Sequence, residues 1–403
     1  MSEVSKRIEA AIKPELLLWA RESAGLDIEE AARKIQVKPE RLECWEQGER
    51  RPTVKQLRKL GGVYKRPLAI FFLSKPPKKF QAMHDFRRLP GEVAGIASPQ
   101  LRVEIRRARY RRQVAIDLFA LRGQSPPVFK TRARLSEDPE AVAARARKLL
   151  GVTTEMQTKA KNGYDALNLW RAALEDQGIL VFQARNVDVA EMRGFSITED
   201  SLPVVVANIK DAPRGRVFTL LHEFVHLMLR EEGLCDLSEH ASVPPQERKV
   251  EIFCNHVTGA ILIPRESLLA EGYVREHGRN PIWEDHELAA LARKYEVSRE
   301  AMLRRLLVLD QTTQAFYKVK RQEFIDAYRD HAEKKKEREG FAPPDRVAVA
   351  AAGPGFVRLV LDSYYNERIT ASDLSDFLDV RLKHMPRIEE AVFGRQIEFG
   401  TAH

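Results

Sequence analysis

The 403-residue sequence predicts a mainly helical protein of the α+β class that contains more than one domain. Its length exceeds the usual size of a single domain, so two or three separate hydrophobic cores are expected. Apolar residues recur at helical spacing over most of the chain. Stretches of β-type composition are confined to one central region, at residues 179–182, 194–197 and 202–207. The sequence therefore predicts helical domains and one small sheet.

Clusters of proline and charged residues divide the chain into four expected segments. Residues 1–75 form an all-helical domain, which ends at the linker-like sequence KPPKK. Residues 76–155 are a basic helical linker region, and residues 156–312 contain the sheet and the most apolar helices. Residues 313–403 begin with a charged helix and end in a small helical domain, whose two amphipathic helices are joined near Asn366.

Within the first segment, residues 12–73 have the pattern of a helix-turn-helix unit. Asp27 is expected to cap a helix, with Glu30 three residues later as its partner in a capping box. Two alanines at positions 31 and 32 permit a close helix crossing, and Pro39 begins the second helix after the turn. This geometry is typical of DNA-binding domains.

The run WEQGERRPT at residues 45–53 resembles the end of the third helix and the following loop in the Xre/Cro repressor-like family. The resemblance extends over the whole helix-turn-helix unit. It implies that double-stranded DNA is a partner, and it puts Lys38, Glu40 and Arg41 at the major groove.

The acidic character of that helix leaves a second interpretation open. Glu40, Glu43 and Glu46 would repel phosphate, so DNA binding could be weak or could give way to protein contacts. The formal net charge of +9 favours nucleic acid only modestly. A helix predicted over residues 98–122 carries six clustered arginines, which form either a basic patch or an ordinary solvated face: Arg102, Arg106, Arg107, Arg109, Arg111 and Arg112.

The helix predicted over residues 216–229 is strongly apolar except for His222, Glu223 and His226. Histidines four positions apart lie on one helix face, so both imidazoles can reach one metal ion. A His-Glu-x-x-His helix binds zinc in this way, leaves a coordination position open for water, and supplies its glutamate as general base. We therefore expect zinc as the cofactor, His222 and His226 as ligands, and Glu223 as the catalytic residue.

A second helix, predicted over residues 246–264, is expected to supply the third protein ligand. Glu247, Glu251 and Asn255 follow one another at four-residue spacing and form one polar face. Glu247 and Glu251 are both candidates, although the two basic residues that follow Glu247 favour a solvated position for it.

The two helices together resemble the ImmA/IrrE family of metallopeptidases over residues 160–310. The features that carry this resemblance are the His-Glu-x-x-His sequence, the later sequence Glu251-x-x-Cys254-Asn255, and an aliphatic stretch that ends at Pro264. The resemblance implies a zincin-like peptidase domain in which Glu251 is the third zinc ligand and Asn255 a supporting residue.

The other histidines and the cysteines give weaker signals. His240, His256 and His277 are candidates for an oxyanion-stabilising role, although each is more often a surface or core histidine. The three cysteines form no Cys-x-x-Cys pair, which suggests neither a disulfide framework nor a cysteine zinc site. Cys235 and Cys254 are therefore interpreted as small core residues rather than ligands.

Residues 287–306 repeat the helix-turn-helix pattern, with a turn at Val297 and Ser298. Such a segment usually ends the ImmA/IrrE peptidase domain, so the resemblance favours a packing role over a second DNA contact.

Together these features predict a DNA-binding regulator fused to a zinc metallo-endopeptidase that cleaves a specific regulatory protein. The alternative is an antitoxin that binds a toxin partner and regulates its own promoter, with little or no proteolysis. A homo-oligomer is compatible with either function. The sequence has no apolar run of about 20 residues and no secretory signal, so we expect no membrane partner and a cytoplasmic location.

Overall fold

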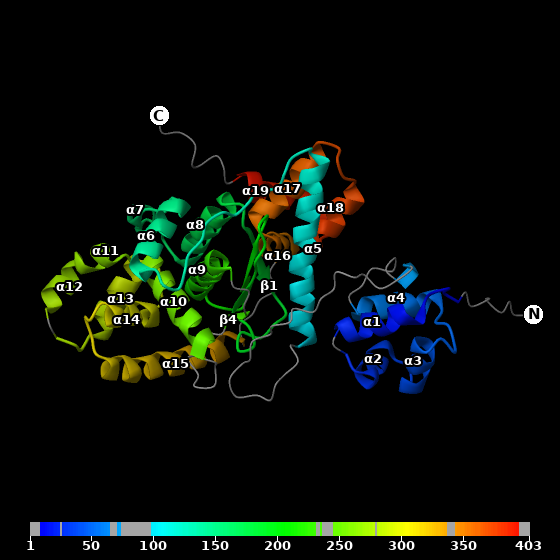
Figure 1. The fold of residues 1–403 in the computed structure, drawn as a ribbon, viewed down its shortest axis with the longest axis horizontal. Coiled ribbons are helices and arrows are strands. Elements are labelled where there is room, and N and C mark those ends of the chain that lie inside the picture. The colour runs from blue at the N-terminus through cyan, green and yellow to red at the C-terminus, as the bar shows by residue number, and fades with distance from the viewer. Residues whose placement is uncertain are drawn as a thin grey trace, which may run out of the picture. The chain divides into compact units, whose positions relative to one another are not determined.

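The computed structural model describes residues 9–24, 26–64, 71–73, 98–230, 234–235, 245–278, 280–336 and 343–394. The chain divides into two compact units. The first comprises residues 1–88 and 92–107, and the second comprises residues 89–91 and 108–403. Figure 1 shows the elements of both in chain order.

The first unit contains the predicted helix-turn-helix. Its described helices, apart from the start of α5, surround one core that includes Leu17, Leu42, Trp45 and Leu57: α1 (Pro14–Ala24), α2 (Ile28–Ile35), α3 (Pro39–Glu46) and α4 (Val54–Tyr64). Asp27 caps α2, because its side chain accepts a hydrogen bond from the backbone N–H of Glu30 at 2.6 Å. The predicted order of helix, turn and helix is confirmed.

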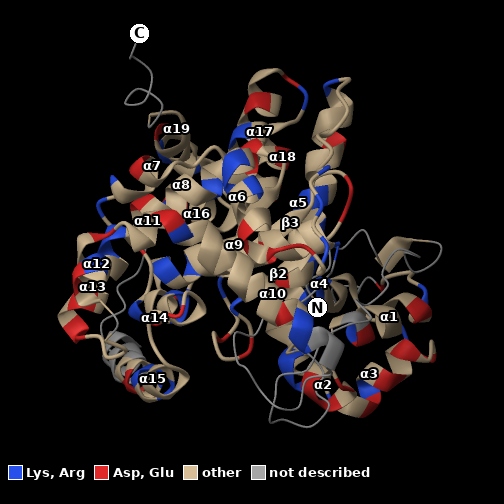
Figure 2. Ribbon diagram, turned by 60° about the vertical axis from the view of Figure 1, so that its left-hand side comes forward, with Lys and Arg blue, Asp and Glu red and all other residues tan. Residues whose placement is uncertain are grey.

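One acidic residue of α3 has a different role from the predicted one. Glu46 forms a two-pronged ion pair with Arg21 of α1, at 2.8 and 3.0 Å, and its side chain is only 6% exposed. Its carboxylate therefore joins α1 to α3 and does not face solvent. The expectation that Glu46 repels phosphate was wrong, because burial against a neighbouring arginine neutralises it. Glu40 and Glu43 remain exposed on α3. Figure 2 shows acidic and basic residues mixed along this part of the chain.

The second unit is built around one sheet of four strands, β1 (Leu180–Ala184), β2 (Gly194–Ile197), β3 (Val204–Asn208) and β4 (Leu234–Cys235), in the order β1-β3-β2-β4. The central strand β3 pairs in parallel with β1 and antiparallel with β2, and the two-residue β4 pairs antiparallel with β2. Every residue of β1, β2 and β3 is buried, as expected for a sheet that is covered on both faces. The three predicted strands are confirmed.

Adjacent residues of β1 show which helices cover each face of the sheet. Val181 belongs to the large core formed with α8 (Gly163–Asp176) and α9 (Pro213–Leu229). Phe182 points to the opposite face, where its ring meets that of Phe356 at 5.8 Å between centroids and lies under the guanidinium of Arg111. Helix α9 is thus held between the sheet and the helices α8 and α10 (Pro245–Leu262) (Figure 1).

The long arginine-rich helix α5 (Pro99–Leu121) agrees with the predicted bounds. Two of its six clustered arginines are not on a solvated face. Arg111 is 3% exposed and donates a hydrogen bond to the backbone oxygen of Ala351 at 2.9 Å. Arg112 donates to the backbone oxygens of Ser201 and Leu202 at 2.8 and 3.0 Å. These arginines tie α5 to the second unit, so at these positions the clustering reflects packing.

The remaining elements of the second unit include every other helix predicted from the sequence and several that were not predicted. They are α6 (Pro139–Leu150), α7 (Thr154–Thr158), α10 (Pro245–Leu262), α11 (Arg265–Leu269), α12 (Gly272–His277), α13 (Asp285–Lys294), α14 (Arg299–Val308), α15 (Gln314–Lys336), α16 (Pro344–Ala352), α17 (Pro354–Tyr365), α18 (Ala371–Leu378), the 3-10 helix η2 (Leu382–His384) and α19 (Met385–Phe393). The tail contains more helices than the two predicted, because α16 and α19 lie on either side of that pair.

No single helix among the described residues is long and apolar enough to cross a membrane. Taken together, α16 and α17 have the length and composition of a membrane-spanning segment, but the two helices are bent by 103° where they meet.

Candidate metal centre

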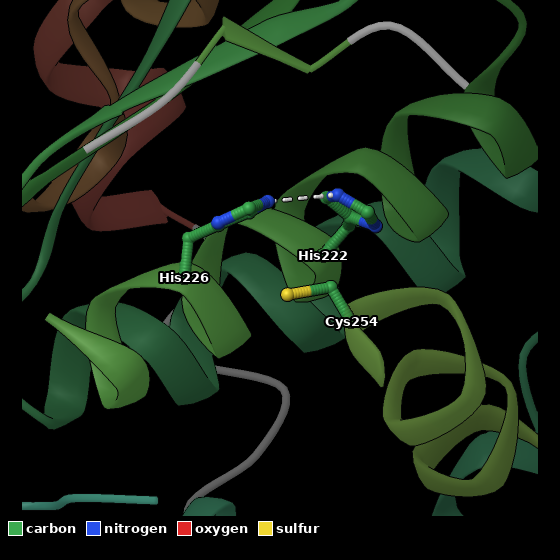
Figure 3. Close-up of side chains that lie close together, drawn as sticks. All are labelled: His222, His226 and Cys254. Atoms are coloured by element: carbon green, nitrogen blue, oxygen red, sulfur yellow. Dashed lines mark hydrogen bonds between the residues drawn. The ribbon is translucent and has the colours of Figure 1, made fainter. Parts of the chain in front are cut away.

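Helix α9 brings two histidines together inside the second unit. Its first turn begins at Pro213, and it ends at Arg230, which adopts the left-handed conformation at φ 62°. Residues 219–228 are all buried, which suits a helix packed against both a sheet and other helices. His222 and His226 lie on one face with their Nε2 atoms 3.0 Å apart, and both are buried. Figure 3 shows the two rings pointing toward one another from successive turns.

Glu251 of α10 faces both imidazoles. Its Oε2 lies 3.2 Å from the Nε2 of His222, and its Oε1 lies 3.2 Å from the Nε2 of His226. Burial raises the pKa of the Glu251 carboxyl, but its hydrogen bonds to the two histidines and their charge outweigh burial, so that the pKa falls well below its usual range. The carboxyl is therefore ionised at neutral pH.

This set of atoms fits a divalent metal ion. Tetrahedral ligands about 2.0–2.1 Å from zinc lie roughly 3.3 Å from one another. The two imidazole nitrogens and the carboxylate are separated by 3.0–3.2 Å, close to that spacing. Two imidazole lone pairs and a carboxylate that meet in a buried space form a donor set that a cation stabilises. The structure brings together the three residues that the sequence analysis assigned as ligands.

Cys254 lies at the same place and is a further candidate. Its Sγ, with ligand atoms of His222 and His226, forms a buried group whose atoms all lie within 4.8 Å of one another. Figure 3 shows the sulfur beside the two rings. Cys254 follows Glu251 by three positions on α10, so both side chains are on one helix face. Its interpretation as a core residue only was therefore incomplete, because sequence spacing does not show how close α10 approaches α9.

We favour Glu251 over Cys254 as the third ligand. Both carboxylate oxygens are already within ligand spacing of the imidazoles. Cys254 is completely buried and also belongs to the apolar core, where a thiol is stable without ionising.

Glu223, the expected general base, is completely buried next to the two histidines. Strand β2 passes directly over it at Gly194. A Cβ atom added at Gly194 would lie 3.5 Å from Glu223 Cγ and 2.8 Å from the backbone oxygen of Val206, and it would collide with Thr219. Only glycine permits this approach, so Gly194 helps to define the space around Glu223. The sequence analysis missed this residue, although a glycine at the start of a buried strand is a typical sign of close packing.

Two of the other candidate histidines take part in contacts of their own. His256 bonds to Glu140 of α6 with 3.0 Å between Nε2 and Oε1. His277 stacks on Trp283 with ring centroids 3.8 Å apart and pairs with a glutamate of α13. His240 and the side chain of Glu247 lie outside the described residues. Asn255 is buried on α10, one turn beyond Glu251.

In the first unit, the three residues expected at the DNA major groove surround the start of α3. Lys38 is the N-cap of this helix, and Glu40 and Arg41 lie in its first turn; all three are exposed. The Arg41 guanidinium lies over the ring of Trp45 at 5.6 Å, which holds the side chain along the helix surface.

Comparison with known families agrees with both sites. Residues 174–307 match the family model of the IrrE N-terminal-like domain, Peptidase_M78. Residues 17–71 match a helix-turn-helix family model, HTH_3. No curated protein matches the chain. The first match covers β1 to β4, α9, α10, α13 and nearly all of α14, and the second covers most of α1 and all of α2 to α4.

Proposed function

We propose that this chain, which carries an IrrE N-terminal-like peptidase domain behind a helix-turn-helix DNA-binding domain, is a regulator that cleaves a specific regulatory protein. The observation that supports this most strongly is the meeting of two Nε2 atoms and a carboxylate within 3.0–3.2 Å beside a buried glutamate. This combination has the parts that peptide hydrolysis needs, which are a cation site and a general base.

His222, His226 and Glu251 would hold the metal, for which zinc is the expected identity. When bound, zinc supplies Lewis acidity, which makes water a stronger acid and a peptide carbonyl a better electrophile. Glu223 takes the proton from the attacking water and returns it to the leaving amine as the peptide bond breaks. Glu223 is buried, and the close approach of Gly194 limits the movement of its side chain.

Substitution of the general base separates proteolysis from binding. Glu223→Gln keeps the size of the side chain and lies outside the ligand set, so metal and fold should persist while proton transfer is lost. We expect the cleavage rate to fall roughly 100-fold or more. The matched control is Glu266→Gln, an exposed glutamate of α11.

The measurement is a comparison of newly formed protein N-termini in cells that carry wild type, Glu223→Gln or Glu266→Gln. Termini that are present with wild type and the control but absent with Glu223→Gln identify the substrate. If the same termini persist with Glu223→Gln, the assigned role of Glu223 is wrong. A cell phenotype that is unchanged by Glu223→Gln supports the antitoxin alternative, in which the chain binds a partner.

We propose that the helix-turn-helix end binds an operator near the chain's own promoter through Lys38 and Arg41. Phosphate contacts release counterions, so the affinity for DNA should fall steeply as the salt concentration rises. Removal of one contact should reduce the slope of log affinity against log salt concentration by about one. Arg41→Ala is compared with Lys148→Ala, an exposed lysine of α6. If the affinity for DNA does not change with salt concentration, or is equal in the two variants, α3 is better explained as a surface for protein contacts.

A further inference from the structure

A cavity of about 640 Å³ lies on the face of the sheet away from α9. Its walls come from segments of the second unit that are far apart in sequence: α5, the residue after β1, α16 and the segment from the end of α18 through η2. Figure 1 shows α5 and α16 beside β1. The volume is in the range that holds a drug-sized ligand.

Part of the lining of the cavity is cationic. It consists of four arginine or lysine side chains, one histidine and one carboxylate, namely Arg111, Arg185, Arg381, Lys383, His384 and Asp379. Arg111 is buried at the base beside Ala351, whereas Arg381 and Lys383 are exposed at the rim. Like charges that are held together in a cavity are unfavourable unless an anion joins them.

Arg185 links this lining to the sheet, because it directly follows β1. Its side chain is 30% exposed, and its Nη2 is 3.7 Å from the carboxylate of Asp379, which is 58% exposed. This distance is too long for a hydrogen bond, so the guanidinium remains able to donate hydrogen bonds to an anion in the cavity.

Another part of the lining is apolar. It is formed by Val347, Ala348 and Ala351 of α16 and by Leu378 at the end of α18. A ligand that fills the cavity must therefore combine an anionic head with an apolar body.

We infer that this cavity binds a small organic anion of that class, with a phosphate or carboxylate head and an aromatic or aliphatic body. The head lies among Arg185, Arg381 and Lys383, and the body lies against α16. Because the walls belong to β1, α5 and the tail, the bound ligand joins the tail helices to the sheet. This site is separate from the metal centre, and its existence does not depend on proteolysis.

The test is isothermal titration calorimetry of the full chain with phenyl phosphate, which has both parts of the ligand. Inorganic phosphate supplies the head alone, and benzyl alcohol supplies the ring alone. We expect saturable binding of phenyl phosphate and at least about tenfold weaker binding of the other two. Phenyl phosphate should also raise the melting temperature, since it binds only the folded chain.

Two variants locate the binding. The double change Arg381→Glu and Lys383→Glu reverses the charge of the rim and should weaken phenyl phosphate at least about tenfold. Arg387→Glu is the matched control, because Arg387 is exposed on α19 and does not line the cavity. Val347→Phe occupies the apolar wall and should weaken phenyl phosphate but not inorganic phosphate. The proposal would be overturned if phenyl phosphate shows no saturable binding. It would also be overturned if Arg387→Glu weakens the binding of phenyl phosphate as much as the double change does.

Discussion

Two clusters of histidine and glutamate lie in the same peptidase region, and their chemistry is different. In the first, Glu140 of α6 accepts two hydrogen bonds from Arg305 of α14, at 2.5 and 2.7 Å, and also pairs with His256 of α10. In the second, the carboxylate of Glu251 lies 3.2 Å from the Nε2 atom of each of the two imidazoles of α9. The first cluster contains a permanent cation, and the second leaves a place for one.

This difference separates a structural ion cluster from a candidate metal site. Arg305 is almost completely buried and also donates to the backbone oxygen of Ile263 at 2.8 Å, so its cluster is complete without any ligand. The Nε2 atoms of His222 and His226 and the carboxylate of Glu251 are all acceptors when each histidine is neutral with its proton on Nδ1. A buried histidine beside a glutamate is therefore not enough to predict metal. The more informative sign is that, within the described part of the chain, the ion pairs of Glu251 include no guanidinium.

The largest predicted effect concerns metal affinity. His226→Ala should weaken zinc binding at least about 100-fold, because it removes a ligand, whereas His256→Ala should leave the affinity unchanged. Competition with a fluorescent zinc chelator measures both variants, and circular dichroism checks that each remains folded. A comparable loss of affinity in the His256 variant would break the distinction between the two clusters.

The second prediction concerns the stability of the complete cluster. Burial raises the pKa of Glu140, but hydrogen bonds from Arg305 and His256 outweigh it and lower the pKa from 4.5 to about 2. A lowered acid pKa stabilises the fold above pH 4.5, and this stabilisation disappears as the pH falls toward 2. Glu140→Gln should therefore cost roughly 2–3 kcal/mol at pH 7, a value reduced for the partial exposure of Glu140, and less at pH 3.

Urea unfolding of wild type and the Glu140 variant at the two pH values measures this difference. A cost that stays constant between pH 7 and pH 3 would contradict the ion-pair explanation.

A smaller effect is expected at a third carboxylate, Glu175 of α8, which accepts a hydrogen bond from a backbone N–H. Burial raises its pKa to about 7, although Arg171 and the backbone N–H of Gly355, at 3.1 Å, act in the other direction. A raised acid pKa means that the fold loses stability as the pH rises from about 4.5 to 7. Glu175→Gln should remove this loss and make the variant about 1–2 kcal/mol more stable than wild type at pH 8.

Thermal unfolding between pH 5 and pH 8 checks this prediction. If the wild type and the Glu175 variant have parallel stability profiles, the carboxyl is not protonated in the folded state.

The sequence predicted the parts of the structure that depend on local spacing. The i and i+4 histidines of α9, the polar face of α10 and the three central strands are all visible as periodic patterns, so they could be predicted. The order of the helix-turn-helix unit could be predicted for the same reason. The resemblances to known families were confirmed by the matches over residues 17–71 and 174–307.

Contacts between distant segments could not be predicted from spacing. Glu46 pairs with Arg21, 25 residues away, so its charge does not reach the surface that was expected to repel DNA. Gly194 approaches α9 across the sheet, and Cys254 lies beside the histidines only because α10 packs closely on α9. The tail helix α16 is small and rich in alanine, which gives a weak periodic signal.

The coordination of the metal tests the central claim most directly. Zinc X-ray absorption spectroscopy of the purified, zinc-loaded chain distinguishes nitrogen and oxygen ligands at about 2.0–2.1 Å from sulfur at about 2.3 Å. With His222, His226 and Glu251 as the ligands, we predict nitrogen and oxygen scattering alone, and the spectrum of Cys254→Ser should match that of wild type. A sulfur shell that disappears in Cys254→Ser would contradict the assignment of Glu251.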